Sequence, residues 1–381
     1  MDRRLFLQRS AALMAASTLV PARRFLSLTG ARSREKSTAR RILVLGGTTF
    51  LGPAIVEAAV AAGHTVTLFN RGITHPELFP HQEKLRGLRS AVTTQENLTA
   101  LDGRRWDAVI DVWPFEPELA ASAARKLAGT TEHYLYVSSI ATYDPRSFAA
   151  PGLAEDAPLN AWDPAIRPYN RGKSESERRL QSIVGDRLTV VRPGAIKGAR
   201  DDTPDVYAWT ERARHGGRHI APGTGDDHVQ IVDVKDVARF MVLAIEQKLT
   251  GTFNLTGPAQ NFREFVTSTA DAVRSSAEFI WVPQSFLHAH GLDPAPWDSP
   301  TVPSYLGLFP YWHPEPERAG FYQISSERAL AAGWKRRPYE ATVLDYLRSM
   351  TEAARGAHWV DELSPEVEAR TLSDWLTHRP G

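Results

Sequence analysis

Short apolar runs alternate with amphipathic stretches over the first half of the chain, and each run has the length of a strand. The runs that predict strands are residues 41–45, 65–69, 106–112, 133–139 and 188–192. The stretches that predict helices are residues 53–62, 118–127 and 169–183. Strands that alternate with helices form a parallel sheet covered by helices on both faces. The pattern therefore predicts an α/β fold with a doubly wound parallel sheet.

The alternation weakens after about residue 195, where proline and tryptophan become frequent and connections lengthen, as in residues 294–311. Ligands of open α/β sheets bind beyond the carboxyl ends of the strands. Residues 196–381 are therefore expected to form mainly a smaller C-terminal substrate-binding lobe over that edge, with some segments returning to the sheet.

A glycine-rich turn, Gly46-Gly47-Thr48-Thr49-Phe50-Leu51-Gly52, joins the first predicted strand to the first predicted helix. Glycines let the backbone turn tightly and approach a pyrophosphate, which then lies at the helix N-terminus. Thr49 stands where the usual pattern has its middle glycine. Residues 40–195 are expected to form a dinucleotide-binding domain of Rossmann type. An ordinary tight turn without a ligand is the alternative.

The second predicted strand ends in Phe69-Asn70-Arg71-Gly72. An NAD-binding domain usually carries Asp or Glu there, which binds the 2′-hydroxyl of the ribose. No acid stands at this position, and Arg71 can face a 2′-phosphate instead. The sequence therefore favours NADP over NAD as the cofactor. A solvated surface arginine is the simpler alternative.

Tyr169 and Lys173 lie four residues apart on a predicted helix, so their side chains share one face. A phenol ionises at about pH 10, and a nearby ammonium or nicotinamide cation favours its phenolate. The preceding predicted strand ends in Ser138-Ser139, and Ser139 can hydrogen-bond the reacting oxygen. We expect Ser139, Tyr169 and Lys173 to be catalytic, with Tyr169 as the acid/base. An amphipathic helix with an incidental tyrosine and lysine is the alternative.

These motifs together resemble the extended short-chain dehydrogenase/reductases, which include the NAD-dependent epimerase/dehydratase family. The glycine turn, Ser-Ser-x-x-x-Tyr at 138–143, Tyr169-x-x-x-Lys173 and Arg192-Pro193-Gly194 carry the resemblance, which covers about residues 40–260. The turn and residues 69–72 are most similar to a branch that contains chloroplast stem-loop-binding proteins and bacterial relatives. Leu88 stands near where relatives carry an Asp beside the adenine.

The resemblance implies hydride transfer on a hydroxyl or ketone of a sugar or sugar-like substrate, as in an oxidoreductase or epimerase. Pro193 is then expected beside the nicotinamide. The turn, the strand end and the resemblance together give the expected cofactor contacts: Gly46, Gly47, Thr49, Phe50, Leu51, Gly52, Asn70, Arg71, Tyr169, Lys173 and Pro193.

The N-terminus has the layout of an export signal. Paired arginines at 3 and 4 precede Leu5-Phe6, and an apolar run of small residues follows from 11 to 20. This order resembles a twin-arginine signal, and the run is shorter than the roughly 20 residues that span a bilayer. Residues 1–39 are therefore expected to be an export signal and linker. The protein is then periplasmic, or cytoplasmic if the signal is not used.

Composition limits the remaining choices. The chain has 381 residues, a formal net charge of +1 and no cysteine, which excludes disulfides and thiolate chemistry. The near-neutral charge argues against a non-catalytic or RNA-binding protein on the same fold, the second hypothesis. The expected partner is a small molecule such as a sugar or nucleotide sugar, with no nucleic acid and no stable membrane insertion, and a homodimer stays open.

Two further groups of residues have weaker claims to a function. Asp201-Asp202 and Asp226-Asp227-His228 are expected to be solvated turns or substrate contacts, so no metal is expected. Trp113, Trp162 and Trp209 fall near strand ends and loops, where an aromatic ring can pack against a sugar. A buried core tryptophan is the commoner case.

Overall fold

The computed structural model describes residues 38–89, 97–112, 116–201, 205–293, 309, 312, 318–349 and 363–378. For residues 205–207 it describes the backbone alone. The boundary between two units of the chain falls at residue 38, and the fold described below is that of residues 39–381. The expected export signal at 1–39 lies almost wholly outside the described residues, as does Trp113. No helix in the described ranges is long and apolar enough to cross a membrane.

A seven-stranded sheet is the central element, with the strand order β11-β6-β5-β4-β1-β2-β3. Every neighbouring pair in it is parallel. Its strands are β1 (Arg41–Leu45), β2 (Thr65–Asn70), β3 (Glu83–Arg86), β4 (Trp106–Asp111), β5 (Thr131–Val137), β6 (Leu188–Pro193) and β11 (Gly251–Leu255). The predicted doubly wound parallel sheet of Rossmann type is confirmed.

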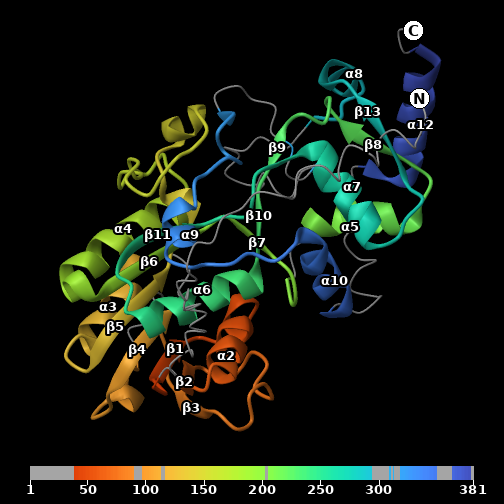
Figure 1. The fold of residues 1–381 in the computed structure, drawn as a ribbon. Helices are drawn as coiled ribbons and strands as arrows, with labels where there is room; N and C mark the ends of the chain where they lie inside the picture. The colour runs from red at the N-terminus through yellow and green to blue at the C-terminus, as the bar shows by residue number, and fades with distance from the viewer. Residues whose placement is uncertain are drawn as a thin grey trace, which may run out of the picture. The chain divides into compact units, whose positions relative to one another are not determined.

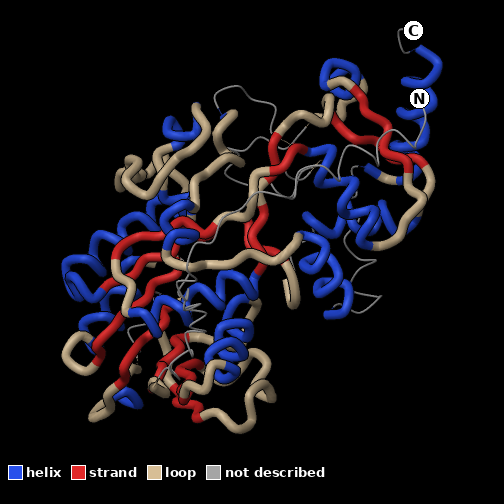
Figure 2. Tube along the Cα trace, in the orientation of Figure 1, coloured by secondary structure: helices blue, strands red, loops and turns tan. Residues whose placement is uncertain are grey.

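Helices cover both faces of this sheet (Figures 1 and 2). Helices α2 (Leu51–Ala61) and α6 (Val234–Gln247) share one apolar cluster with β1 and β2. Helices α3 (Pro117–Leu127) and α4 (Pro168–Val184) share another, which includes Tyr134 and Tyr136 of β5. Since successive strand residues point to opposite faces, the alternation of β1 side chains between the two clusters fixes the strand register.

A third apolar cluster gathers around Trp209 and Phe262. It is built on β8 (Arg218–Pro222) and β13 (Glu278–Val282), which pair in parallel. Two short strand pairs also lie in the described part of the chain: β7 (Ala195–Lys197) with β10 (Ile231–Asp233), and β9 (His228–Val229) with β12 (Gln260–Asn261). Further α-helices in the described ranges are α5 (Asp205–His215), α7 (Phe262–Ala272), α8 (Gln284–Ala289), α9 (Glu327–Ala331), α10 (Tyr339–Ser349) and α12 (Pro365–His378).

Most predicted element bounds agree with the structure within two residues. The strand expected at 133–139 is shifted, since β5 ends at Val137 and both following serines lie outside it. Strand β3, with the sequence EKLR, was missed because it is a short, charged edge strand with no apolar alternation.

Candidate active site

The turn after β1 requires glycine at both of its first positions. Gly46 has φ +116° and Gly47 has φ +93°, which is backbone that other residues rarely adopt. A Cβ on Gly47 would lie 2.4 Å from a Leu68 methyl, and one on Gly46 would lie 2.7 Å from a Val112 methyl. The turn therefore packs directly on its neighbours and leaves its backbone open on the other side.

The rest of the turn shapes the start of helix α2. A Cβ on Gly52 would lie 2.6 Å from the Cα of Gly47, so the helix packs against the turn itself. Phe50 has φ +39° at the helix N-cap, and Leu51 is buried. Phe50, Leu51 and Gly52 thus support the turn from within, whereas Gly46, Gly47 and Thr49 reach the cavity beside it.

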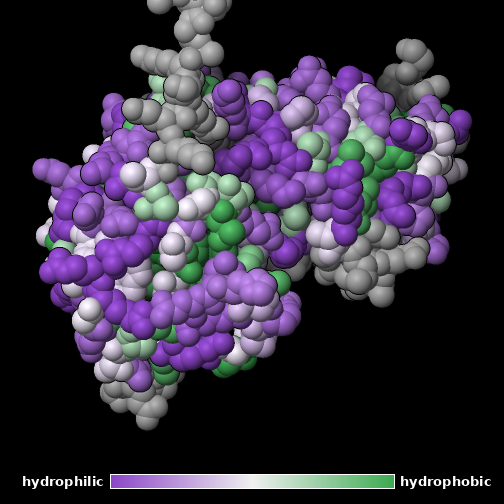
Figure 3. Space-filling view, turned by 60° about the horizontal axis from the view of Figure 1, so that its bottom comes forward, coloured by the Kyte–Doolittle hydropathy of each residue, from purple (hydrophilic) through white to green (hydrophobic). Residues whose placement is uncertain are grey.

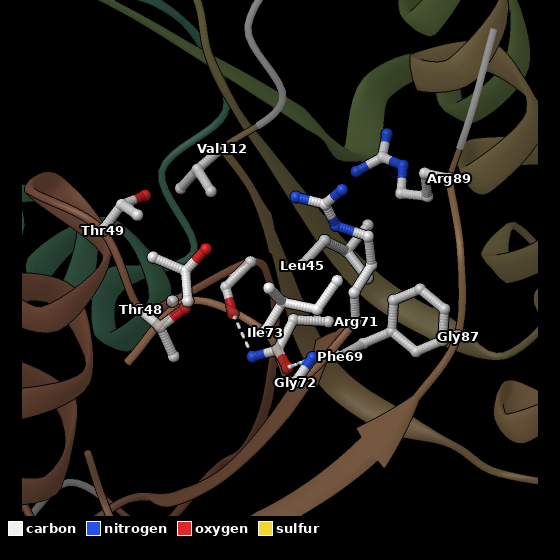
Figure 4. A pocket seen from close by; sticks show the side chains of 14 residues that line it. Leu45, Thr48, Thr49, Phe69, Arg71, Gly72, Ile73, Gly87, Arg89 and Val112 are labelled. Atoms are coloured by element: carbon white, nitrogen blue, oxygen red, sulfur yellow. Dashed lines mark hydrogen bonds between the residues drawn. The ribbon is translucent and has the colours of Figure 1, made fainter. Parts of the chain in front are cut away.

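That cavity has a volume of about 310 Å³ and opens at the carboxyl ends of β1 and β2 (Figure 4). It is lined by Leu45, Gly46, Gly47, Thr48, Thr49, Phe69, Asn70, Arg71, Gly72, Ile73, Thr74, Gly87, Arg89 and Val112. This described lining contains two arginines and no acid. Backbone glycines at a helix start together with cationic side chains suit a dinucleotide phosphate, so the residues fit the expected cofactor.

Asn70 ties the end of β2 to the glycine turn and to β3. Its Nδ2 donates to the carbonyl of Gly46 at 3.1 Å, and its Oδ1 accepts from the backbone N–H of Gly72 at 2.9 Å. The same Oδ1 accepts from Nη1 of Arg86 at 2.5 Å. Asn70 therefore holds the cavity wall in shape, and Arg86 adds a third cation near this edge.

Arg89 was missed by the sequence analysis, which noted only Leu88 before it. Its guanidinium binds both carboxylate oxygens of Asp111, at 2.8 and 3.0 Å, and it also donates to the carbonyl of Leu119. In Figure 4 the Arg71 and Arg89 side chains point into the same part of the cavity. Leu88 itself pairs with Asn97 in an isolated bridge and does not line the cavity.

Lys173 is buried, with 2% of its surface exposed, on the second turn of α4. Its Nζ donates to the carbonyl of Val137, the last residue of β5. The Nζ also lies 4.8 Å from the Tyr136 ring centroid and 5.8 Å from that of Tyr169. Burial lowers the pKa of Lys173 to about 7, so this ammonium titrates near neutrality.

Tyr169 and Ser139 lie around that lysine. Tyr169 stands in the first turn of α4 and is 40% exposed. Ser139 lies two residues after Val137, the residue whose carbonyl accepts from Lys173. The Oγ of Ser139 accepts from the N–H of Ala141 at 3.1 Å. The structure thus brings all three expected catalytic residues to the carboxyl end of β5.

A buried ion pair lies behind this group. Arg192, next to Pro193, binds Glu177 of α4 through Nη2 at 2.6 Å and Nε at 3.1 Å. Ser138 donates to the same carboxylate, and Arg192 also donates to the carbonyl of Glu155 at 3.0 Å. Pro193 is buried at the end of β6 and does not line the cavity.

The weaker candidates fall into the core or into turns. Asp226 accepts from the Thr224 hydroxyl at 2.8 Å, and Asp227 accepts from the Trp312 indole at 2.6 Å. Among the residues with described placement, no three His, Asp or Glu side chains are grouped as for a metal ion. Trp209 is fully buried in the core, whereas Trp162 is 56% exposed. Hydrophilic residues predominate on the face drawn in Figure 3.

Comparison with known proteins finds a match to one family model and two similar proteins. Residues 117–256 match the model of the NAD dependent epimerase/dehydratase family. The chain is 31% identical over 242 residues to "Chloroplast stem-loop binding protein of 41 kDa b, chloroplastic" of Arabidopsis thaliana, covering 60% of this chain and 61% of that protein. It is 27% identical over 262 residues to human "Epimerase family protein SDR39U1", covering 65% of this chain and 85% of that protein.

Solved structures share the fold. The Bordetella bronchiseptica enzyme WbmG in complex with NAD and UDP has a TM-score of 0.59 at 16% identity, covering 83% of this chain and 95% of that chain. UDP-N-acetylglucosamine 4-epimerase from Bacillus cereus has a TM-score of 0.56 at 17% identity, covering 82% of this chain and 100% of that chain. The match over residues 117–256 agrees with the family that the motifs predicted.

Proposed function

Because residues 117–256 match the model of the NAD dependent epimerase/dehydratase family, we propose that this protein is an NAD(P)-dependent oxidoreductase or epimerase. It acts by hydride transfer on a hydroxyl or ketone of a sugar or nucleotide sugar. The observation that carries the proposal is the buried Lys173 ammonium, held by the end of β5 within 5.8 Å of the Tyr169 ring centroid.

The cavity beside the glycine turn is the proposed dinucleotide site. Gly46, Gly47 and Thr49, which line it, would hold the phosphates of a dinucleotide, and Asn70 and Arg71 would bind its ribose. When bound, the nicotinamide accepts or returns the hydride. The lack of an acid among the described lining residues, with Arg71 and Arg86 near the β2 end, supports NADP over NAD.

Tyr169 is the proposed acid/base. Its exposed phenol can reach a substrate, while the Lys173 cation behind it favours the phenolate that takes the hydroxyl proton. Ser139 donates a hydrogen bond to the same substrate oxygen and orients it. Lys173 would also donate to the ribose of a bound cofactor. Return of the proton from the Tyr169 hydroxyl completes an epimerisation or a ketone reduction.

A nucleotide sugar is the proposed substrate class. The structural relatives include an enzyme bound to NAD and UDP and a UDP-N-acetylglucosamine 4-epimerase. Their low identity gives only the fold, so the substrate is tested directly. UDP-glucose and UDP-N-acetylglucosamine are incubated with the purified chain, and the products are separated by chromatography.

Mass spectrometry after denaturation tests the cofactor, and Tyr169→Phe tests the acid/base. A co-purified dinucleotide is expected, and the variant should lose turnover about 100-fold or more while binding NADPH normally. Tyr339→Phe, the same change at a hydroxyl that bonds Thr269 of α7, is the matched control. Undiminished turnover of the Tyr169→Phe protein would refute the assignment.

Arg71→Glu tests the cofactor preference. NADP should bind the wild type more tightly than NAD, and the variant should lose NADP affinity about tenfold or more because a carboxylate repels the 2′-phosphate. Arg105→Glu, an exposed change just before the amino end of β4 and so at the opposite end of the strands, is the control. Comparable affinities of the wild type for both dinucleotides in titration calorimetry would contradict the preference.

Stem-loop binding is the second candidate, since the Arabidopsis relative carries that name. The formal net charge of +1 gives no basic field for it. A filter assay with a stem-loop RNA at several salt concentrations separates the two functions, because phosphate binding weakens steeply with salt.

We also propose export through the twin-arginine pathway, which rests on the N-terminal sequence alone. Replacing Arg3 and Arg4 by lysines should leave the protein in the cytoplasmic fraction after cell fractionation. Periplasmic recovery of that variant would argue against the pathway.

A further inference from the structure

Asp111 and Lys173 lie on the same face of the sheet, and both are neighbours of Tyr136. Asp111 is the register partner of Tyr136 on the neighbouring strand. Tyr134, two residues earlier on β5, donates to Asp111 at 2.8 Å, so Asp111 points to the face that both tyrosines occupy. The Nζ of Lys173 lies 4.8 Å from the Tyr136 ring centroid on that face.

This face holds more charge than a core usually does. Asp111 is 0% exposed and Arg89 is 8% exposed, and the two are joined by a bidentate ion pair. A carboxylate buried this deeply is retained only where cations compensate it. Arg89 is one such cation, and it also lines the proposed cofactor cavity.

Other charged and titratable groups also influence Lys173. Glu177 lies one turn further along α4 but is held by Arg192, and Glu116 precedes α3. Tyr136 and Tyr169 contribute the rings beside the ammonium. Burial lowers the pKa of Lys173, Asp111 and the two glutamates raise it, and Arg89 lowers it.

We propose that the Arg89–Asp111 ion pair is a positioning pair for Lys173, in which Asp111 keeps the buried ammonium charged and Arg89 limits that effect from the wall of the cofactor cavity. The lysine role itself rests on the proposed function. Arg89 lines the cofactor cavity, and Asp111 lies on the same face of the sheet as Lys173. The ion pair therefore connects the cofactor cavity to the catalytic lysine.

The proposal requires shifts of opposite sign from the two members of one ion pair. Asp111→Asn removes the anion, so the ammonium should lose its proton at lower pH. Arg89→Gln removes the cation that opposes it, so the ammonium should keep its proton to higher pH. General loosening of the core would rehydrate Lys173 in both variants and shift both titrations upward.

The experiment follows the lysine directly in the full chain. The protein is labelled with ¹⁵N at the lysine Nζ, and the Lys173 resonance is assigned by its loss in Lys173→Gln. Its titration midpoint should fall by about one pH unit, a tenfold change in proton affinity, in Asp111→Asn and rise in Arg89→Gln. Asp107→Asn, the same change at the amino end of β4, should leave it in place.

Two results would overturn the inference: an unchanged midpoint in Asp111→Asn, or shifts of the same sign in both variants. If Asp111→Asn does not fold, the double variant Asp111→Asn/Arg89→Gln removes both charges together, and its midpoint should lie below that of the wild type. A midpoint at or above the wild-type value would overturn the inference too. Failure here leaves the proposed function standing, since that function is tested by co-purified cofactor and by Tyr169→Phe.

Discussion

Replacing Glu177 by leucine should destabilise the fold by about 3–5 kcal/mol, because it leaves a buried guanidinium without its counter-ion. Arg192 is 4% exposed and binds the Glu177 carboxylate through two nitrogens, at 2.6 and 3.1 Å. Among the described residues, its remaining contacts after the change are the carbonyl of Glu155 and the side chain of Tyr143, whose ring centroid lies 4.7 Å from the Arg192 Cζ. Neither carries a negative charge. A loss of this size is a large part of the roughly 5–15 kcal/mol that stabilises a domain.

Urea unfolding at pH 7, followed by tryptophan fluorescence, measures the loss. Glu175→Leu is the matched control, two residues earlier on the same helix, where the carboxylate binds Arg178 and Arg179 near the surface. That control should change stability by less than about 1 kcal/mol.

The double variant Glu177→Leu/Arg192→Met decides whether the buried charge is the cause. Removing both partners leaves no unpaired ion, so the double variant should regain much of the stability lost in Glu177→Leu. A loss below about 1 kcal/mol in Glu177→Leu, or a double variant less stable than the single one, would refute the reasoning.

Three further changes give distinct readouts. Gly52→Ala should unfold more easily and bind dinucleotide less tightly, since its Cβ would lie 2.6 Å from the Cα of Gly47. Burial lowers the pKa of His133 from 6.5 to about 4, so the folded state binds fewer protons than the unfolded state between these two pH values. The free energy of unfolding of the wild type should therefore fall by about 3 kcal/mol as the pH drops through this window. His133→Phe should remove this part of the pH dependence. Asn70→Ala should weaken NADPH binding in titration calorimetry, because its hydrogen bond to the Gly46 carbonyl is lost.

Each of these three predictions has a control variant or a result that would contradict it. Gly129→Ala has open space for the added methyl and should be neutral, so equal losses at both glycines would remove the steric explanation. His81→Phe, at an exposed position, should keep the wild-type acid limb. An Asn70→Ala protein that binds NADPH as tightly as the wild type would mean that this amide does not shape the cavity.

The alternation of apolar runs was enough to predict the sheet, since buried parallel strands need near-continuous apolar residues. The Gly46–Gly47 turn and the Tyr169–Lys173 spacing predicted which segments meet at its carboxyl edge. Arg89 could not be predicted, because its importance depends on pairing across space with Asp111, 22 residues later. The acid inside the apolar run WDAVID was the local signal available, since a carboxylate there needs a buried partner.

The strand order has a consequence for synthesis on the ribosome. Strand β11, residues 251–255, pairs with β6 and closes one edge of the sheet. Until that segment leaves the exit tunnel, β6 presents an unpaired row of backbone groups beside an incomplete apolar face. Parallel pairing also waits for long chain segments to close. The nascent chain therefore exposes an unpaired, aggregation-prone strand edge until residues 251–255 are synthesised. A chaperone that covers β6 during this time should raise the yield of folded protein.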